Sequence, residues 1–548
     1  MTRGGLVRKV GDAVAAGALM AAATLFGADQ PAIPGHAVPI SGPYAGILAA
    51  STDVGPTGLT RVHLTTSLRA AAEPVRLRAW AQGNGLTVRW RPGDDWAMIE
   101  GPAAAVADAF GVVIRDYRLG DYRPGNSAGQ RDDAGEVFYA SPQQPGIPAS
   151  ARTEVSGMGR IFGYTPTREA LPTMPRDVPD GGLLPTHLLK AYNATSLVQE
   201  GFTGAGQTVV VFAFDGFRQS DMDQFTSTFG LAPLTPEVVG GMPERRVGEA
   251  NMDLQVLHAI APDAKLVLVN ARSTTNNDGG TAFEKLGRLM ESVDRQFPGA
   301  IWSFSIGWGC DRLFTAADLA PVRAALAAAL RNGTTAFNAS GDLAGLECKG
   351  GQNWSDPPNP DDVGVDAVAS LPEMTSVGGT KLSTSADGEW LAEQSWYDVP
   401  LIQGTGGGVS TLFKRPKWQT VDAADPLPAQ RLVPDVAAVA DPNTGVRIVF
   451  NGKVVTGGGT SQAAPIWAGL TALMNQKFTA GGAKPLGEFN PLLYRIAQGS
   501  ALPGFRDISL GGNAINPGSA AGYDLVTGLG TPNVENLVKN ILLARVGG

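Results

Sequence analysis

The sequence has no excess of basic residues. Its 548 residues include 43 Lys and Arg against 51 Asp and Glu, which gives a formal net charge of −8 at pH 7. We find no basic cluster, no P-loop and no RNA-binding motif, and a protein that binds a phosphate backbone needs such groups. Nucleic acid is therefore excluded as a partner.

Long hydrophobic runs are lacking after the first thirty residues. Within residues 1–30, basic residues precede the apolar run 13–28, which is too short and too rich in alanine for a typical bilayer span. We therefore expect a signal peptide over 1–30 and a secreted, extracellular protein. The alternative is an uncleaved N-terminal anchor, and only in that case would a membrane be a partner.

Cysteine is scarce, with Cys310 and Cys348 as its two occurrences. Each follows an apolar segment, 301–309 or 335–339, that is typical of a parallel strand. If these strands are neighbours joined by the intervening helix, both thiols reach the same sheet edge and can form a disulfide in an oxidising compartment. Two unpaired thiols are the alternative, because a sequence does not give their separation.

The chain does contain enough apolar residues for large cores. Hydrophobic residues make up 43% of the sequence and charged residues 17%, and 548 residues suffice for two or three domains. The 71 glycines and 39 prolines indicate many turns and little coiled coil.

The glycine-rich segment 457–465, which runs into the apolar stretch 466–470, has the pattern of a nucleophile site. Glycines let the chain turn sharply out of a strand, and the apolar run predicts a buried helix with Ser461 and Pro465 in its first turn. A hydroxyl there lies beside free backbone N–H groups, which suit a serine that attacks a carbonyl. A capped glycine turn is the simpler alternative. An α/β-hydrolase esterase is excluded, because its G-x-S-x-G motif needs glycine where Ala463 stands.

Together with segments 433–438 and 441–445, this glycine-rich segment resembles the sedolisins, which are serine-carboxyl peptidases with a subtilisin-like fold. Subtilisins carry their histidine base in an HGTH-type segment. The histidines of this chain lie in no such motif: His36, His63, His187 and His258. A serine nucleophile without histidine must find its base among carboxylates.

The segment 248–262 supplies the candidate carboxylates. Its apolar residues recur at helical spacing, and Pro262 marks its end. Glu249 and Asp253 are four residues apart, so they stand about 40° apart on one flank of the helix. We expect Glu249 to take the proton of Ser461 as general base while Asp253 polarises Glu249. An acidic pair near a helix start is by itself typical of a solvated face, but sedolisins carry Glu-x-x-x-Asp in this setting.

The resemblance also implies a third acidic residue, Asp342, in a segment similar to the SGD segment of sedolisins. The family aspartate replaces the asparagine of the subtilisin oxyanion hole, although here Leu343 follows instead of serine. An aspartate donates a hydrogen bond to an oxyanion only while it is protonated, so acid pH should favour catalysis. Sedolisins often place a glutamate near the end of the strand 209–214, and since Asp215 is out of register with it, we leave Asp215 outside the catalytic set.

Near the C-terminus, segments 505–512 and 520–530 resemble the calcium-binding end of sedolisins. Calcium takes about six hard oxygen ligands, which carboxylates and the carbonyls of a glycine-rich loop can supply. The resemblance implies one structural Ca²⁺, with carboxylates from Asp507 and Asp524 and carbonyls from Ile508, Ala520 and Gly522. The alternative is that these aspartates only form turns.

Residues 40–165 form a separate predicted region. We expect a short strand followed by a helix within 64–80, a hairpin around 92–95, and an α+β sandwich of ferredoxin-like kind. This region resembles the sedolisin pro-domain, an intramolecular inhibitor of its own enzyme. The linker 166–183, rich in Pro, Thr and Asp, is where we expect the maturation cut.

The sequence thus predicts an α/β protein with a subtilisin-like catalytic domain over 184–548, built on a mostly parallel, doubly wound sheet and preceded by the smaller pro-domain. The expected function is that of a secreted, acid-acting serine-carboxyl peptidase, made as a zymogen, that cleaves peptide or protein substrates through an acyl-enzyme. The alternative is a catalytically silent surface binding protein with the same fold. Loss of one of four residues would favour it, and all four are present: Ser461, Glu249, Asp253 and Asp342.

Overall fold

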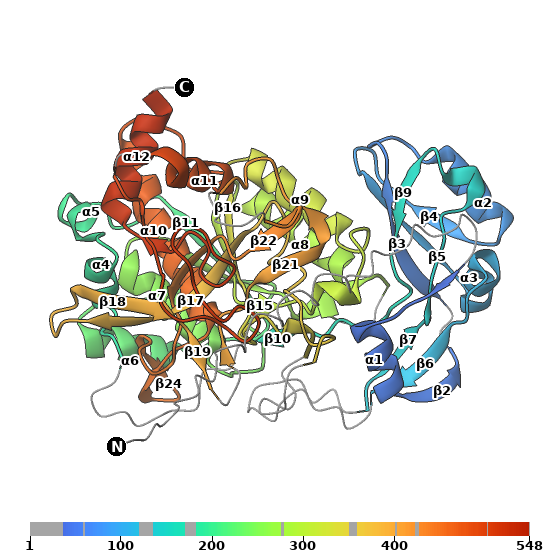
Figure 1. Ribbon diagram of the computed structural model, residues 1–548, viewed down its shortest axis with the longest axis horizontal. Coiled ribbons are helices and arrows are strands. Elements are labelled where there is room, and N and C mark those ends of the chain that lie inside the picture. The colour runs from blue at the N-terminus through green and yellow to red at the C-terminus, as the bar shows by residue number, and fades with distance from the viewer. Residues whose placement is uncertain are drawn as a thin grey trace, which may run out of the picture.

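Two bodies of different size make up the chain in the computed structural model, as the ribbon in Figure 1 shows. The smaller body, blue to cyan, holds the N-terminal strands, and the larger body holds the rest. The structure describes residues 37–58, 61–119, 135–169, 182–275, 279–349, 359–399, 403–421, 427–500 and 502–546. The predicted signal peptide, 1–30, and most of the predicted linker, 170–181, lie outside the described residues.

The smaller body contains a four-stranded antiparallel sheet in the order β4-β5-β3-β9. Its elements follow in the chain as β3 (Val62–Leu68), α2 (Val75–Gly83), β4 (Thr87–Arg89), β5 (Trp96–Gly101), α3 (Ala103–Phe110) and β9 (Val155–Met158). This βαββαβ succession with that strand order is the ferredoxin-like arrangement expected from the sequence. The two helices pack on the sheet through Leu77 and Phe110.

Individual elements of this body were only partly predictable. The hairpin expected around 92–95 is confirmed, because β4 and β5 pair antiparallel. The helix expected within 64–80 is wrong in its first half, since β3 extends to Leu68 and the helix begins at Val75. Pairing of β3 with both β5 and β9 makes it a central strand, and its β-branched residues suit that position.

A second, three-stranded sheet joins the smaller body to the larger one. It consists of β2 (Thr52–Pro56), β6 (Arg115–Arg118) and β7 (Val137–Ala140), next to α1 (Pro43–Ala50). Aromatic residues of this region share one buried cluster with the larger body, and the rings of Phe162 and Phe314 have centroids 6.2 Å apart. The smaller body is therefore packed against the larger one.

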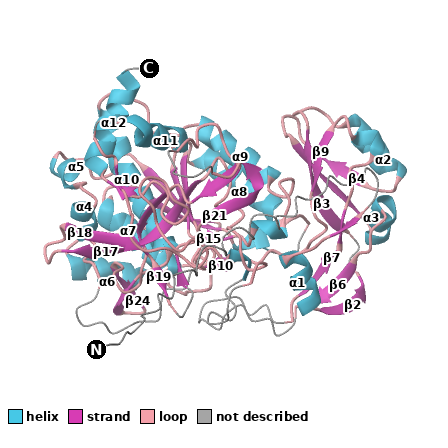
Figure 2. Ribbon diagram, viewed as in Figure 1, coloured by secondary structure: helices cyan, strands magenta, loops and turns pink. Residues whose placement is uncertain are grey.

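The larger body is built on an eight-stranded sheet, drawn among its helices in Figure 2. The strand order is β12-β13-β11-β14-β16-β17-β18, and β23 also pairs with β17. All neighbours are parallel except β17 and β18. The strands are β11 (Thr208–Ala213), β12 (Glu237–Val239), β13 (Lys265–Asn270), β14 (Ile301–Phe304), β16 (Thr335–Ala339), β17 (Thr375–Thr384), β18 (Trp390–Ser395) and β23 (Val436–Val439).

Helices cover both faces of this sheet. Along β11, Val209 and Val211 belong to the hydrophobic cluster that contains α7 (Glu249–Ile260) and α10 (Thr460–Ala480). The alternate residues Val210 and Phe212 belong to the cluster on the other face, with α8 (Ala282–Gln296) and α9 (Ala320–Arg331). A strand buried on both faces in a parallel sheet is typical of a doubly wound fold, so the predicted fold class is confirmed.

The remaining elements are shorter or peripheral. They are β1 (Val38–Pro39), β8 (Gln143–Gln144), β10 (Arg168–Glu169), α4 (His187–Ala191), α5 (Thr195–Gln199), α6 (Gln219–Phe229), β15 (Ile306–Gly307), β19 (Tyr397–Asp398), β20 (Gln403–Gly404), β21 (Gly408–Lys414), β22 (Gln430–Val433), β24 (Arg447–Phe450), β25 (Lys453–Thr456), α11 (Asn490–Gly499), β26 (Phe505–Arg506), β27 (Thr531–Pro532) and α12 (Val534–Val546), with short 3₁₀ turns at 149–151, 272–275, 311–313 and 347–349. Within the described ranges, no helix has both the length and the apolar composition that a bilayer span requires.

A disulfide joins Cys310 to Cys348, with the two Cα atoms 4.8 Å apart. As expected, the cysteines follow β14 and β16, which are parallel neighbours connected by α9. The predicted pairing is therefore confirmed, and it ties together two loops at the carboxyl edge of the sheet.

Candidate active site

Ser461 is the second residue of α10, the central buried helix of the larger body. Gly459 precedes the helix with φ 83°, a conformation that favours glycine and allows the sharp turn out of the preceding segment. The side chain of Ser461 is buried, with 2% of its surface exposed. Pro465 lies in the second turn of the helix and not in the first as predicted.

The proline has a local consequence for the serine. Because Pro465 lacks an N–H group, the carbonyl of Ser461 has no helical partner four residues on. That carbonyl instead accepts a hydrogen bond from the hydroxyl of Ser305, at 3.0 Å. Ser305 lies between β14 and β15. The start of α10 is therefore hydrogen-bonded to the carboxyl end of the central strand β14.

Glu249 and Asp253 occupy the first two turns of α7 and are both buried. The Ser305 hydroxyl also lies 3.1 Å from Oδ1 of Asp253, and the Ser461 hydroxyl lies 3.5 Å from the Ser305 carbonyl. The structure therefore brings Asp253 and Ser461 to the same side chain, Ser305. The solvated-face alternative for the acidic pair is wrong, because the whole of α7 is buried.

Close packing brings the two helices together. A Cβ atom on Gly469 would lie 3.1 Å from Ile260, and one on Gly457 would lie 2.8 Å from the sulfur of Met252. Glycine at both positions lets α10 and its preceding loop approach α7. On its other side, α7 is fixed by Gln255, whose amide both donates to and accepts from the backbone of Val449 in β24.

Asp342 follows β16 and is bonded to the start of α10. Its Oδ1 accepts hydrogen bonds from the backbone N–H and the hydroxyl of Thr460, both at 2.8 Å. The Thr460 hydroxyl in turn accepts from the N–H of Gly341, at 3.1 Å. Asp342 is thus placed one residue away from Ser461, and it is only partly buried.

Asp215, which sequence reasoning left outside the catalytic set, contacts the start of α7. Its carboxylate accepts hydrogen bonds from the N–H groups of Val247, Gly248 and Ala250, at 2.9 to 3.1 Å. Burial raises the pKa of Asp215 to about 6, although these N–H groups act in the opposite direction. The sequence gives one signal for this contact, because Asp215 directly follows a predicted buried strand. It does not reveal that α7 is the element that Asp215 contacts.

A two-residue ladder lies next to Ser305. The backbone of β10, residues 168–169, pairs antiparallel with β15, residues 306–307. Figure 1 places β10 and β15 together within the larger body. An extended segment can therefore pair with the short strand β15 next to Ser305, and backbone pairing of this kind is a common way to bind a peptide.

The two carboxylates predicted to bind calcium each contact the backbone of another residue of the predicted set. Oδ2 of Asp507 accepts from the N–H of Gly522 at 2.9 Å, and Oδ2 of Asp524 accepts from the N–H of Ala520 at 3.2 Å. Both carboxylates thus reach one short loop, and Ile508 lies directly after Asp507. Burial raises the pKa of Asp524 to about 6. Two carboxylates converging on glycine-rich backbone form a donor set of hard oxygens that fits calcium.

Comparison with known proteins gives the context for this geometry. No protein-family profile matches the chain. Kumamolisin from Bacillus sp. (strain MN-32) is 30% identical over 522 residues, which covers 88% of this chain and 86% of kumamolisin. Sedolisin from Pseudomonas sp. (strain 101) is 27% identical over 465 residues, covering 80% and 73%. Human tripeptidyl-peptidase 1 is 29% identical over 435 residues and covers 73% of each chain.

A solved structure agrees with these relatives. Pseudomonas sedolisin, a serine-carboxyl proteinase complexed with two molecules of pseudo-iodotyrostatin, superposes with a TM-score of 0.56 at 25% identity. The match covers 66% of this chain and 98% of that structure. The chain therefore belongs to the sedolisin family of serine-carboxyl peptidases and is a hydrolase of peptide bonds.

Proposed function

We propose that this peptidase uses Ser461 as its nucleophile. In this mechanism Ser461 Oγ attacks the carbonyl carbon of the peptide bond while Glu249 takes its proton and Asp253 polarises Glu249. The proton then passes to the leaving amine as the C–N bond breaks, and water hydrolyses the acyl-enzyme. The observation that carries this proposal is the Ser305 hydroxyl, which contacts both Asp253 and the nucleophile's residue.

Asp342 is the proposed side-chain donor of the oxyanion hole. Its Oδ1 is occupied by the two hydrogen bonds from Thr460, which leaves Oδ2 to carry a proton toward the oxyanion. A carboxyl group donates only while protonated, so catalysis should be favoured in acid. The backbone N–H groups at the start of α10 supply the rest of the stabilisation.

The smaller body is the proposed inhibitory pro-domain, with bounds near 40–165 as the sequence indicates. Arg89 in β4 makes two hydrogen bonds to Glu284 in α8, at 2.7 and 2.8 Å, and Arg91 pairs with Glu291 at 2.7 Å. These ion pairs hold the smaller body against α8 of the larger body. The β10 segment, which lies beside Ser305 in the manner of a bound peptide, supports the same interpretation.

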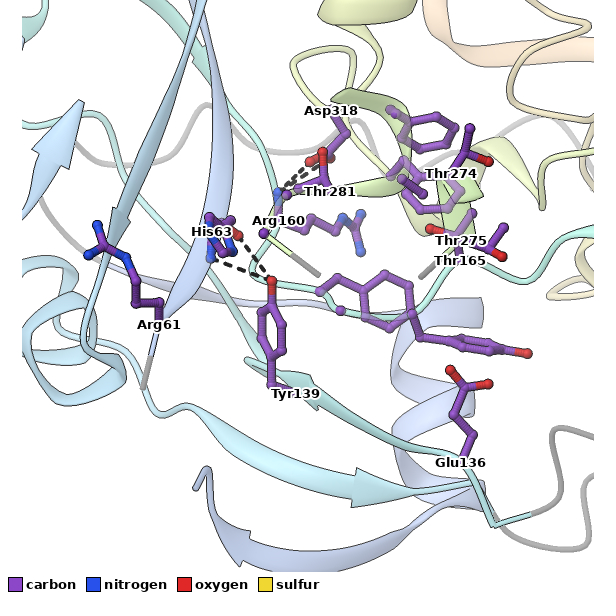
Figure 3. Close-up of a pocket in the computed structure, with 18 residues that line it drawn as sticks. Arg61, His63, Glu136, Tyr139, Arg160, Thr165, Thr274, Thr275, Thr281 and Asp318 are labelled. Carbon is purple, nitrogen blue, oxygen red and sulfur yellow. Dashed lines mark hydrogen bonds between the residues drawn. The ribbon is translucent and has the colours of Figure 1, made fainter. Parts of the chain in front are cut away.

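A pocket of about 300 Å³ lies between the two bodies, near the contact of Arg89 with Glu284. Figure 3 shows lining residues from both bodies, with His63, Tyr139 and Arg160 from the smaller one and Thr274, Thr275 and Asp318 from the larger one. The N–H of Arg160 donates to Asp318 at 3.0 Å, and the hydroxyl of Tyr139 lies 3.4 Å from the N–H of His63. A junction with a pocket and polar contacts suits a temporary attachment.

One structural calcium ion is proposed at the C-terminal loop. Asp507 and Asp524 would supply carboxylates, and Ile508, Ala520 and Gly522 would supply carbonyl oxygens. A bound cation would replace the N–H contacts of the two carboxylates and hold segments 507–508 and 520–524 together. Thermal unfolding with added calcium and with a chelator tests this, and an equal Tm in both would contradict it.

Self-processing in acid is tested by acidifying the purified precursor and, in parallel, a Ser461→Ala variant. We expect new N-termini between about residues 164 and 185 in the unmodified protein alone. Equal processing of both proteins would show that Ser461 is not needed for maturation. Processing of neither protein would contradict acid-triggered self-maturation.

A further inference from the structure

Helix α7 begins without a cap of its own. Its N-cap residue is Gly248, with φ 105°, which has no side chain to accept the first N–H groups of the helix. Four N–H groups at a helix start have no partner within the helix and need one elsewhere when they are buried. Here every residue of the helix is buried, so water does not satisfy them.

Asp215 supplies the missing acceptor from another element. It lies two residues after the end of β11 and is fully buried. Oδ2 accepts from Val247 and Gly248, and Oδ1 accepts from Ala250. Both oxygens of Asp215 therefore act as acceptors, as an ionised carboxylate allows. In a neutral acid or an amide, only the carbonyl oxygen would accept in this way.

We infer that Asp215 is a positioning residue for the general base, fixing the first turn of α7 so that Glu249 stays in place for proton transfer. Glu249 lies between two of the residues whose N–H groups Asp215 binds, Gly248 and Ala250. This inference rests on the proposed role of Glu249. Asp215 touches neither Ser461 nor the peptide in this mechanism and acts through the backbone of the helix.

The charge of Asp215 is set by several neighbours. Arg245 and Arg246 precede α7, with Arg246 close to Gly216, and Arg272 donates to the backbone of Phe214. The acidic groups of the helix itself are Glu249 and Asp253. Burial raises the pKa of Asp215, so as the pH falls the carboxylate takes a proton and one oxygen stops accepting. The positioning contact is therefore complete on the alkaline side of that pKa and weakens below it.

The test compares Asp215→Asn with the unmodified enzyme after activation, using a fluorogenic peptide from pH 3 to 7. A misplaced base costs on the order of ten- to a hundredfold in kcat, while KM should stay nearly constant. The ratio of unmodified to variant kcat should be largest near neutral pH. It should shrink in acid, where Asp215 of the unmodified enzyme is itself neutral. A residue of purely structural importance would lower stability and leave the kcat of the folded enzyme unchanged.

Asp221→Asn is the matched control. Asp221 is also buried and contacts α7, but through the side chain of Asn251, and it accepts from the backbone of Asn451 and Gly452. This variant should lose thermal stability and keep the pH dependence of the unmodified enzyme. Equal kcat ratios at all pH values for Asp215→Asn would overturn the inference, as would failure of both variants to fold.

Glu249→Gln separates the inference from the mechanism on which it rests. If that variant keeps its turnover, Glu249 is not the base and the proposed function fails. If it is inactive while Asp215→Asn has unmodified kcat, the mechanism stands and only the positioning role is lost.

Discussion

At the residue scale, the site depends on hydroxyl and backbone contacts between segments that lie far apart in the sequence. Ser305 joins Asp253 to the start of α10, and Thr460 joins Asp342 to it. The acids and the nucleophile could be predicted because their spacing and resemblance are local properties. The groups that these hydroxyls join lie 52 to 156 residues apart along the chain, and only the fold brings them together.

Replacement of the proposed base tests the mechanism most directly. Glu249→Gln keeps the shape of the side chain but removes the basic carboxylate, so turnover should fall by at least about a hundredfold. Circular dichroism should show an unchanged fold. Retained turnover in a folded variant would remove Glu249 from the mechanism.

Replacement of the proposed oxyanion donor tests the acid requirement. In Asp342→Asn the amide can donate to the oxyanion without a proton, while its oxygen can still accept from Thr460. We expect activity to extend toward neutral pH, measured as kcat/KM against pH. A profile that keeps its alkaline limb unchanged would mean that another group imposes the acid requirement.

At the element scale, the candidate site is built on two buried helices. Helix α7 carries Glu249 and Asp253, and helix α10 carries Ser461. The sequence predicted both helices, since each has an apolar run and a recognisable start. It did not predict how closely they approach, because that distance depends on which glycines face which side chains. Nor did it predict that Asp215, from the loop after β11, caps α7, since a cap from a distant segment leaves no local pattern.

The approach of the two helices can be tested at Gly469. A Cβ atom there would lie 3.1 Å from Ile260, so Gly469→Val should force the helices apart at a cost of about 1–3 kcal/mol of unfolding free energy. Thermal unfolding measures this as a lower Tm. Gly499→Val in α11 is the control, because a Cβ there meets no described atom within 4 Å. Equal Tm values for the two variants would contradict the packing argument.

At the scale of the whole molecule, the two bodies are held together by a shared aromatic cluster and by ion pairs. The ferredoxin-like topology of the smaller body was predictable from the alternation of its elements. The polar contacts across the junction were not, because they pair β4 with α8, which lie 195 residues apart in the chain. Among these contacts, the surroundings of His63 bear on the response to acid.

His63 should make docking of the smaller body depend on pH. Its ring lies 3.3 Å from Glu100, near Arg61, Arg89 and Glu284, and burial lowers its pKa below 6.5. If undocking exposes the ring, the free form takes up a proton that the docked form resists. Docking is then strongest above pH 6.5 and weakens as the pH falls through that value.

His63→Gln removes this titration, so the onset of self-processing should move to lower pH, as seen by gel electrophoresis and N-terminal sequencing. His187→Gln is the control, because burial also lowers the pKa of His187 but this residue lies in α4 of the larger body. The same onset for His63→Gln and the unmodified precursor would count against the role of His63.

The proline in the second turn of α10 has a mechanical consequence. Since the nucleophile's own carbonyl accepts a hydrogen bond from Ser305, the start of the helix is coupled to the carboxyl ends of the strands. A bound peptide that moves Ser305 is therefore expected to move the attacking oxygen as well. Binding of the substrate would then also align the hydroxyl of Ser461.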